Sequence, residues 1–188
     1  MLIEDPALIE QRCYEGWTPL IIAAAEGHTE MVEWLVNHGG ADTEAETLSG
    51  ESALFWACFR GHSQIFSFLL SKGSNPPNMR GNDLPDGHCN DPFMLAACRG
   101  HIEILQLLLS RQDIDIDSTE WDSGPTAIYR AAYSNRSQAV RLLLEAGADP
   151  RIPFGERETP LDAATRLGHV ECIRLLEVRF VCKSFLFT

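Results

Sequence analysis

The chain has few basic residues. Its 188 residues include 15 lysines and arginines against 27 aspartates and glutamates, which gives a formal net charge of -12 at pH 7. Tight binding to nucleic acid without regard to base sequence needs a basic face against the phosphates, so this composition argues against it. The same deficit argues against docking on an anionic membrane surface. We therefore expect neither nucleic acid nor a membrane as a partner.

A long apolar run is also missing. No stretch approaches the roughly 20 apolar residues that a transmembrane helix needs. The chain opens with MLIEDPALIE, in which Glu4 and Asp5 precede any apolar run, so we expect no secretory signal. Its six cysteines have neither Cys-x-x-Cys spacing nor the density of a disulfide scaffold, which favours free thiols. Free thiols indicate a reducing compartment, so the expected location is the cytoplasm or the nucleus.

Signatures of catalysis and of cofactor or metal binding are missing too. The sequence has no glycine-rich phosphate loop and no dinucleotide fingerprint. The run from Asp113 to Asp117 alternates aspartate with isoleucine, but a helix-loop-helix calcium site needs glycine and glutamate where this chain has Ser118 and Gly124. The alternation favours a half-buried extended segment. His88-Cys89 is a lone pair without the spacing of a zinc site. We expect no enzyme activity, no cofactor and no metal.

What the chain does contain is internal repetition. A Gly-His pair followed by an amphipathic segment begins at four places, Gly27, Gly61, Gly100 and Gly168. Ten residues before each histidine stands a helix-capping residue followed by proline or alanine and an apolar residue. With a fourth copy that lacks Gly-His, these triplets are Thr18-Pro19-Leu20, Ser52-Ala53-Leu54, Asp91-Pro92-Phe93, Thr126-Ala127-Ile128 and Thr159-Pro160-Leu161. They recur at intervals of 34, 39, 35 and 33 residues, which predicts stacked repeats.

Local rules account for each copy. Thr, Ser or Asp at the start can accept a hydrogen bond from an unpaired N-H of the first helical turn. The glycine ends the first helix in the left-handed conformation, for which Asn135 in the fourth copy is the next-best residue. Apolar doublets four residues apart then give the second helix a broad apolar face. One helix pair cannot bury that face, so neighbouring copies must stack.

The elements Trp17-Thr18-Pro19-Leu20, Ala23-Ala24, Gly27-His28 and Leu142 to Asp149 resemble the ankyrin repeat. The resemblance implies an all-α fold, an ankyrin-repeat solenoid of helix-turn-helix units with projecting β-hairpin-like fingers. We expect a degenerate N-terminal capping segment (1–15), an apolar C-terminal tail (178–188) and five copies between them, in residues 16–177. The expected copies are 16–49, 50–88, 89–123, 124–156 and 157–177.

Several positions depart from the family pattern. Members usually have histidine directly after Thr-Pro-Leu, where it ties adjacent loops together; this chain has Ile21, Phe55, Met94, Tyr129 and Asp162. The insertion from Asn75 to Asn90 is rich in Pro, Asn, Gly and Asp, which predicts an enlarged finger. The tail either folds back over the last helix or was once followed by further repeats. The histidines of the Gly-His pairs, which share one structural slot, favour a structural role over a catalytic one.

The resemblance also implies a concave surface made by the fingers and first helices. Residues just before each Gly-His and beside each cap would point into it. The candidate partner-binding residues are Trp17, Glu26, Phe59, Arg60, Cys98, Arg99, Trp121, Tyr133, Ser134 and Arg166. Exposed aromatics and arginines are enriched at interface hot spots. The alternative is that Phe59 and Tyr133 pack against neighbouring repeats.

These features favour a non-catalytic scaffold that binds a partner protein. The alternative is a substrate-recognition adaptor of a larger assembly, for example a ubiquitin ligase, whose docking segment lies outside this chain. The fingers are acidic, so a basic segment of the partner would associate faster, although an ordinary solvated rim explains the same charges. We expect a monomer unless the apolar tail self-associates.

Overall fold

Paired helices make up the described part of the chain. The computed structural model describes residues 8–13, 15–73, 91–119, 124–155 and 157–184, and for 179–184 only the backbone. The chain divides into two compact units, an N-terminal unit of residues 1–92 and a C-terminal unit of residues 93–188. The insertion Asn75–Asn90 and the last four residues of the expected tail lie outside the described residues.

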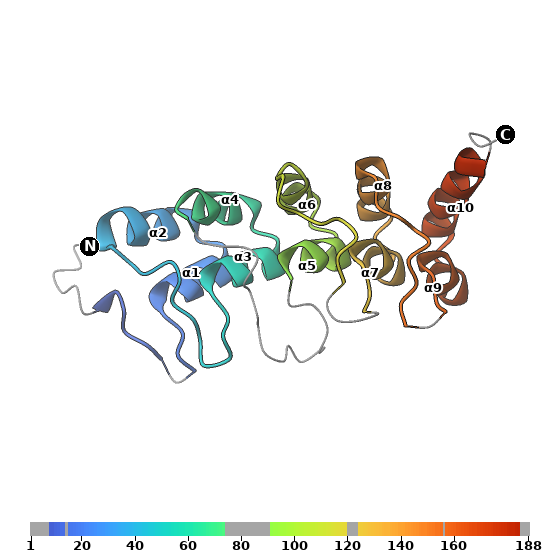
Figure 1. Ribbon diagram of the computed structural model, residues 1–188. Coiled ribbons are helices and arrows are strands. Elements are labelled where there is room, and N and C mark those ends of the chain that lie inside the picture. Colours follow the sequence, from blue (N-terminus) through green and yellow to red (C-terminus); the bar gives the residue numbers. More distant parts are fainter. Residues whose placement is uncertain (1–7, 14, 74–90, 120–123, 156, 185–188) are drawn as a thin grey trace. The chain divides into compact units, whose positions relative to one another are not determined.

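The described residues of the N-terminal unit form two helix pairs (Figure 1). They are α1 (Pro19–Glu26) with α2 (Thr29–Trp34), which continues into a π-helical turn, η2 (Leu35–Gly39), and α3 (Ala53–Arg60) with α4 (Ser63–Ser71). The first helices α1 and α3 pack side by side, and the second helices α2 and α4 do the same. Ile21, Phe55 and Phe66 are fully buried between them. Stacking therefore buries the apolar faces that the repeat pattern predicts.

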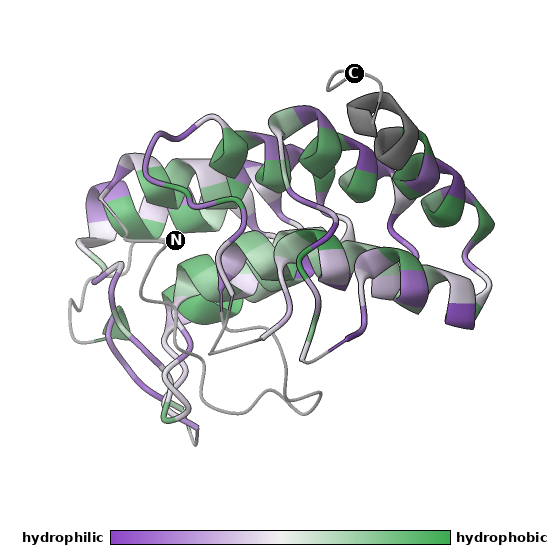
Figure 2. Ribbon diagram, turned by 45° about the vertical axis from the view of Figure 1, so that its right-hand side comes forward, coloured by the Kyte–Doolittle hydropathy of each residue, from purple (hydrophilic) through white to green (hydrophobic). Residues whose placement is uncertain are grey.

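The C-terminal unit contains three helix pairs. They are α5 (Pro92–Arg99) with α6 (Ile102–Leu109), α7 (Ala127–Tyr133) with α8 (Ser137–Ala146), and α9 (Pro160–Leu167) with α10 (Val170–Ser184). Helix α7 packs on α9, and α8 lies between α6 and α10. Hydrophobic and hydrophilic residues alternate along these helices (Figure 2), and the hydrophobic ones include the buried Leu105, Val140 and Leu143. Helix α10 continues to Ser184, so the backbone of tail residues 178–184 extends the last helix.

None of the helices in the described residues is both long enough and apolar enough to cross a membrane.

The predicted helix ends are confirmed. The side chains of Thr18, Ser52, Thr126 and Thr159 each accept a hydrogen bond from the backbone N-H three residues later. Asn135 is the one described residue other than glycine with a positive φ, 56°. It ends its turn in the left-handed region, as expected of the residue that replaces the glycine of the other copies.

The side chain after each turn ties neighbouring copies together. Nε2 of His62 lies 3.2 Å from the carbonyl oxygen of Ala25, and Nδ1 of His169 lies 2.9 Å from that of Ala132. Arg136 stands in this slot in the fourth copy, and its Nε donates to the carbonyl oxygen of Cys98 at 3.2 Å. A structural role is thus observed for His62 and His169, and Arg136 takes it over where the histidine is missing.

Two fingers are closed by single antiparallel bridges. One bridge pairs Glu46 with Ser52, and the other pairs Phe154 with Glu158. Ile114 and Ile116 are half-buried whereas Asp113 and Asp115 are exposed, as the alternation predicts for this finger segment. These two fingers therefore end at the capping residues of α3 and α9, and this brings their side chains next to the first helices.

The last helix pair turns polar residues outward. Tyr129 lies on α7, at the position where the family pattern has histidine. Its hydroxyl donates to Glu158 of the following finger, so this position faces the next copy. Ile21, Phe55, Met94 and Tyr129 are all buried at this position, whereas Asp162 is exposed. Asp162 instead forms a capping box with Thr159. The last described copy therefore has a polar, exposed residue at a position that is buried in the other four copies.

Replacing Gly27 with alanine should destabilise the chain more than replacing Gly40. Both glycines have a left-handed φ, but a Cβ on Gly27 would lie 2.6 Å from Cε1 of His62, whereas a Cβ on Gly40 meets nothing within 4 Å. We expect Gly40→Ala to cost about 1 kcal/mol of unfolding free energy through backbone strain. Gly27→Ala should cost about 1 kcal/mol more, because the displaced His62 ring loses its hydrogen bond. Urea unfolding followed by circular dichroism measures both, and equal losses would contradict the proposed role of this close approach.

Candidate functional site

In the N-terminal unit, three predicted site residues surround a tryptophan, Trp56, that was not predicted. The ring centroids of Trp17 and Phe59 lie 4.7 Å and 5.3 Å from that of Trp56, and the guanidinium of Arg60 lies over the Trp56 ring at 5.9 Å. The three aromatic side chains are half-buried and Arg60 is exposed. This cluster offers an apolar surface with one positive charge at its end.

Local structure explains how this cluster forms. Trp56, Phe59 and Arg60 share one face of α3 because they are three and four residues apart. Trp17 directly precedes the N-cap of α1 and reaches this face because α1 packs on α3. Trp56 was not among the predicted residues, although its spacing from Phe59 and Arg60 is a signal that could have found it.

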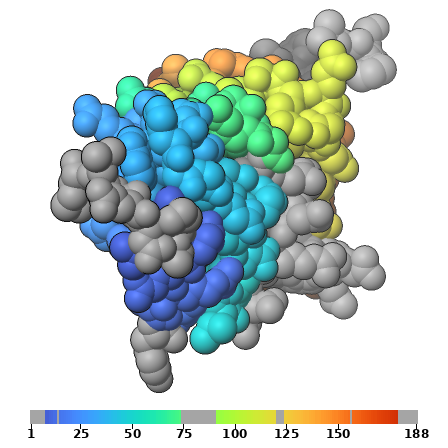
Figure 3. Space-filling view, turned by 90° about the vertical axis from the view of Figure 1, so that its left-hand side faces the viewer, coloured from blue at the N-terminus to red at the C-terminus, as the bar shows by residue number. Residues whose placement is uncertain are grey.

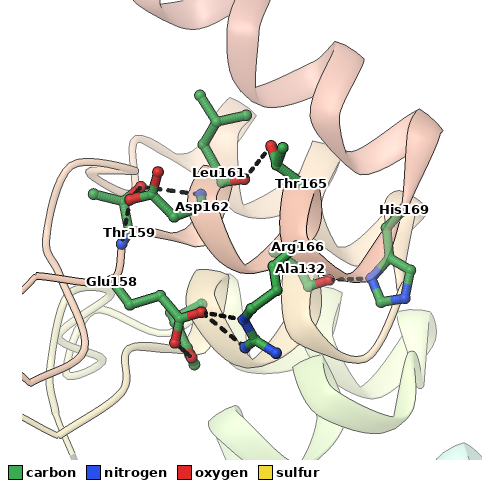
Figure 4. A network of polar contacts seen from close by, with 9 residues as sticks. Ala132, Glu158, Thr159, Leu161, Asp162, Thr165, Arg166 and His169 are labelled. Carbon is green, nitrogen blue, oxygen red and sulfur yellow. Dashed lines mark hydrogen bonds and ion pairs between the residues drawn. The ribbon is translucent and has the colours of Figure 1, made fainter.

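In the C-terminal unit, a polar network holds the predicted residue Arg166 (Figure 4). Nε and one terminal nitrogen of Arg166 lie 2.8 Å and 2.7 Å from Oε1 of Glu158. The hydroxyl of Tyr129 donates to the other oxygen, Oε2, at 2.8 Å. The same Arg166 guanidinium lies 5.9 Å from the ring centroid of Tyr133, which is 46% exposed. The network thus holds Arg166 against an accessible aromatic ring.

The hydrogen bonds of this network shift the pKa values of its members. Those from Tyr129 and Arg166 lower the pKa of Glu158, so its carboxylate stays charged at neutral pH. Burial, and then the hydrogen bond to Glu158, raise the pKa of Tyr129, so its phenol stays protonated. A phenol donor and a carboxylate acceptor are therefore both present in the forms that the geometry requires.

The other predicted residues occupy more varied positions. Sγ of Cys98 lies 3.2 Å from Oγ of Ser134, and both side chains are half-buried. Arg99 is half-buried at the end of α5, and Glu26 is exposed at the end of α1. Trp121 lies outside the described residues. The Phe59 ring packs against Phe55 and Trp56 of its own helix, α3, so these contacts do not test the alternative that it packs against a neighbouring repeat. The partner-binding role of all these residues stays a prediction.

The chemistry that these clusters offer is that of a binding surface. Aromatic rings, a guanidinium and hydrogen-bonding groups come together at the ends of first helices. Within the described ranges, no three His, Cys, Asp or Glu side chains come together as they would to hold a metal ion.

Replacing Glu158 with glutamine should make the unfolding free energy depend less on pH in the acidic range. The pKa of Glu158 is lower in the folded chain than its unfolded value of about 4.3, so the group stabilises the fold above that pH. This stability is lost as pH falls through the folded pKa. We expect the unfolding free energy to drop less between pH 6 and pH 3 in Glu158→Gln than in the unchanged chain. Urea titrations at stepped pH test this, and parallel curves would contradict it. Some decline should remain, because Asp162 and Glu171 also have lowered pKa values.

Known proteins resemble the chain along most of its length. A family model described as ankyrin repeats, in three copies, matches residues 1–80 and 93–178. The crystal structure of the human ASB11 ankyrin repeat domain superposes with a TM-score of 0.75 at 28% identity, covering 90% of this chain and 72% of that one.

Curated relatives are much longer proteins. The ankyrin repeat and KH domain-containing protein mask-1 of Caenorhabditis elegans is 32% identical over 172 residues, which cover 89% of this chain and 6% of that protein. The human transient receptor potential cation channel subfamily A member 1 is 29% identical, covering 82% of this chain and 13% of its own length. The probable E3 ubiquitin-protein ligase XBOS33 of rice (Oryza sativa subsp. japonica) is 30% identical, and the match covers 78% of this chain and 29% of that protein. The chain thus spans less than a third of each of these relatives.

Proposed function

Because the chain belongs to the ankyrin-repeat family, we propose that it is a non-catalytic scaffold that binds a partner protein through its first helices and fingers. One feature shared by both units carries the proposal. In each unit an arginine guanidinium lies 5.9 Å from an aromatic ring at the end of a first helix, Arg60 over Trp56 and Arg166 over Tyr133. A fold does not dictate a function, but these are the side chains that dominate binding energy at protein interfaces.

The proposed partner carries a basic segment. Among the described finger residues, Asp42, Glu44 and Glu46 are exposed and carry negative charge. A basic segment that crosses the fingers would associate faster because of their field, and added salt would reduce the gain. We place this binding in the cytoplasm or the nucleus, as expected from the sequence; fluorescence microscopy of the tagged chain would test that location.

A double substitution tests the binding surface. Arg60→Glu reverses one charge in the first cluster, and Tyr133→Ala removes one ring from the second. Neither side chain is buried. Since a hot-spot residue contributes about 2 kcal/mol or more, we expect the partner's recovery from a cell lysate to fall by about tenfold or more. Affinity capture with quantitative mass spectrometry measures the recovery, after circular dichroism has shown that the variant is folded.

A control variant makes a charge reversal and an apolar truncation of comparable kind on second helices. Arg141→Glu with Met31→Ala reverses one exposed arginine on α8 and truncates one exposed apolar residue on α2. This control should retain the partner. If both double variants capture the same proteins as the unchanged chain, the binding surface lies elsewhere on the molecule.

The second candidate function is a substrate-recognition adaptor of a ubiquitin ligase. It is favoured by the likeness to the rice protein, whose name assigns it to that class. The same capture experiment separates the two functions. Ubiquitin-ligase subunits that are retained by Arg60→Glu/Tyr133→Ala, while other captured proteins are lost, would support the adaptor.

A further inference from the structure

The negative charge of the chain is concentrated in its N-terminal unit. Residues 1–92 contain 14 acidic and four basic side chains, whereas residues 93–188 contain 13 and 11. Ten of the twelve net negative charges therefore belong to the first half. Because a field of one sign attracts partners of the opposite sign, the two units present different surfaces to a partner.

An apolar strip crosses the N-terminal unit from its first finger to the end of α3. The strip consists of Leu48, Trp17, Trp56 and Phe59. The backbone N-H of Leu48 donates to the carbonyl oxygen of Glu15 at 3.0 Å, which places the finger tip beside Gly16 and Trp17. Trp17 contacts Trp56, and Trp56 contacts Phe59. Ring contacts therefore join Trp17, Trp56 and Phe59, and Leu48 lies beside Gly16, the residue that directly precedes Trp17.

Part of the strip is open to solvent. Leu48 is 81% exposed at the finger tip, an unusual position for a leucine that serves only the core. Ile22, which occupies in α1 the position that Trp56 occupies in α3, is 43% exposed. Figure 3 shows the residues of the first two copies, coloured blue to cyan, side by side on the face turned to the viewer.

Exposed carboxylates belong to the segments that carry this strip. The backbone oxygen of Glu15 accepts the hydrogen bond from Leu48, Glu46 precedes Leu48 by two residues, and Glu26 ends α1; all three side chains are exposed. Arg60 lies over Trp56, at the opposite end from Leu48. Among the described residues of the unit, three basic side chains, Arg12, Arg60 and Lys72, stand against ten acidic ones. The complement of such a surface is an apolar side chain flanked by positive charges.

We propose that the strip in the N-terminal unit is the docking site for the basic segment of the partner, which inserts a large apolar side chain between lysines or arginines. This inference rests on the proposed scaffold function and assigns its basic partner to one of the two units. The apolar contact supplies buried area at the strip, and the carboxylates accelerate association and fix the orientation.

Selection from a peptide library tests the proposal directly. The probe is a phage-displayed library of random dodecapeptides, panned on the immobilised 188-residue chain. We expect the selected peptides to be enriched in Lys and Arg around Leu, Ile, Phe or Trp. Selection of acidic or neutral peptides, or of none above background, would overturn the proposal.

Paired variants then locate the binding of the best selected peptide. Fluorescence anisotropy should show affinity about tenfold weaker for Glu44→Lys/Glu46→Lys, with the difference shrinking at high salt. The control pair Glu103→Lys/Glu145→Lys makes the same charge change on exposed positions of α6 and α8 and should change affinity less than twofold. Equal weakening by both pairs would show attraction to net charge alone and would overturn the assigned site.

A second comparison isolates the apolar anchor. Leu48→Ser should weaken the peptide about fivefold or more, while Met31→Ser, on α2 and 49% exposed, should leave it unchanged. If Tyr133→Ala weakens the peptide and Leu48→Ser does not, this inference fails while the scaffold function stands. Sedimentation would reveal a different outcome if the unchanged chain forms dimers and Leu48→Ser dissociates them. A second copy of the chain would then occupy the strip, and the proposed basic partner would be overturned.

Discussion

Each helix pair has an apolar face that it cannot bury alone, and the rest of the structure depends on this constraint. Phe55 and Phe66 in the N-terminal unit, and Leu105 and Val140 in the C-terminal unit, are buried only because another pair packs against them. A buried side chain of this size contributes about 1.5–3 kcal/mol, so the stability of one pair belongs largely to its contacts with the next. The left-handed turn after each first helix serves the same end, because it lets His62 approach Gly27 closely enough to bond the previous copy.

Stacking also decides which residues remain available to a partner. Positions that face a neighbouring copy are filled by buried residues such as Ile21 and Ala24, which leaves the ends of the first helices and the fingers as accessible places for varied side chains. Arg60 and Arg166 both lie there, each against an aromatic ring. A binding surface in such a place can change without loss of the core, and this is why the two units can share one architecture and differ in charge.

Much of the fold could be predicted from the sequence because its rules are local. Thr18 caps α1 and Gly27 ends it through interactions within a few residues, and such signals repeat in phase along the chain. The clusters were only partly predictable because they depend on packing between elements. Trp17 and Trp56 meet across α1 and α3, and Tyr129 meets Glu158 from 29 residues away. No local pattern specifies the register that brings such pairs together. The division into two units was not predicted either.

The bond between Tyr129 and Glu158 also bears on the missing histidine of the family pattern. That histidine ties adjacent loops, and four of the five copies replace it with a residue that is buried. An isoleucine or phenylalanine at this position can fill space but cannot form a polar tie. Tyrosine can do both, because its ring is buried while its hydroxyl reaches the carboxylate at the end of the next finger. Since the same carboxylate holds Arg166, the tie that orders the finger also positions the exposed arginine. In this unit, the stiffness of the repeat junction and the shape of the candidate binding surface therefore depend on one side chain, Glu158.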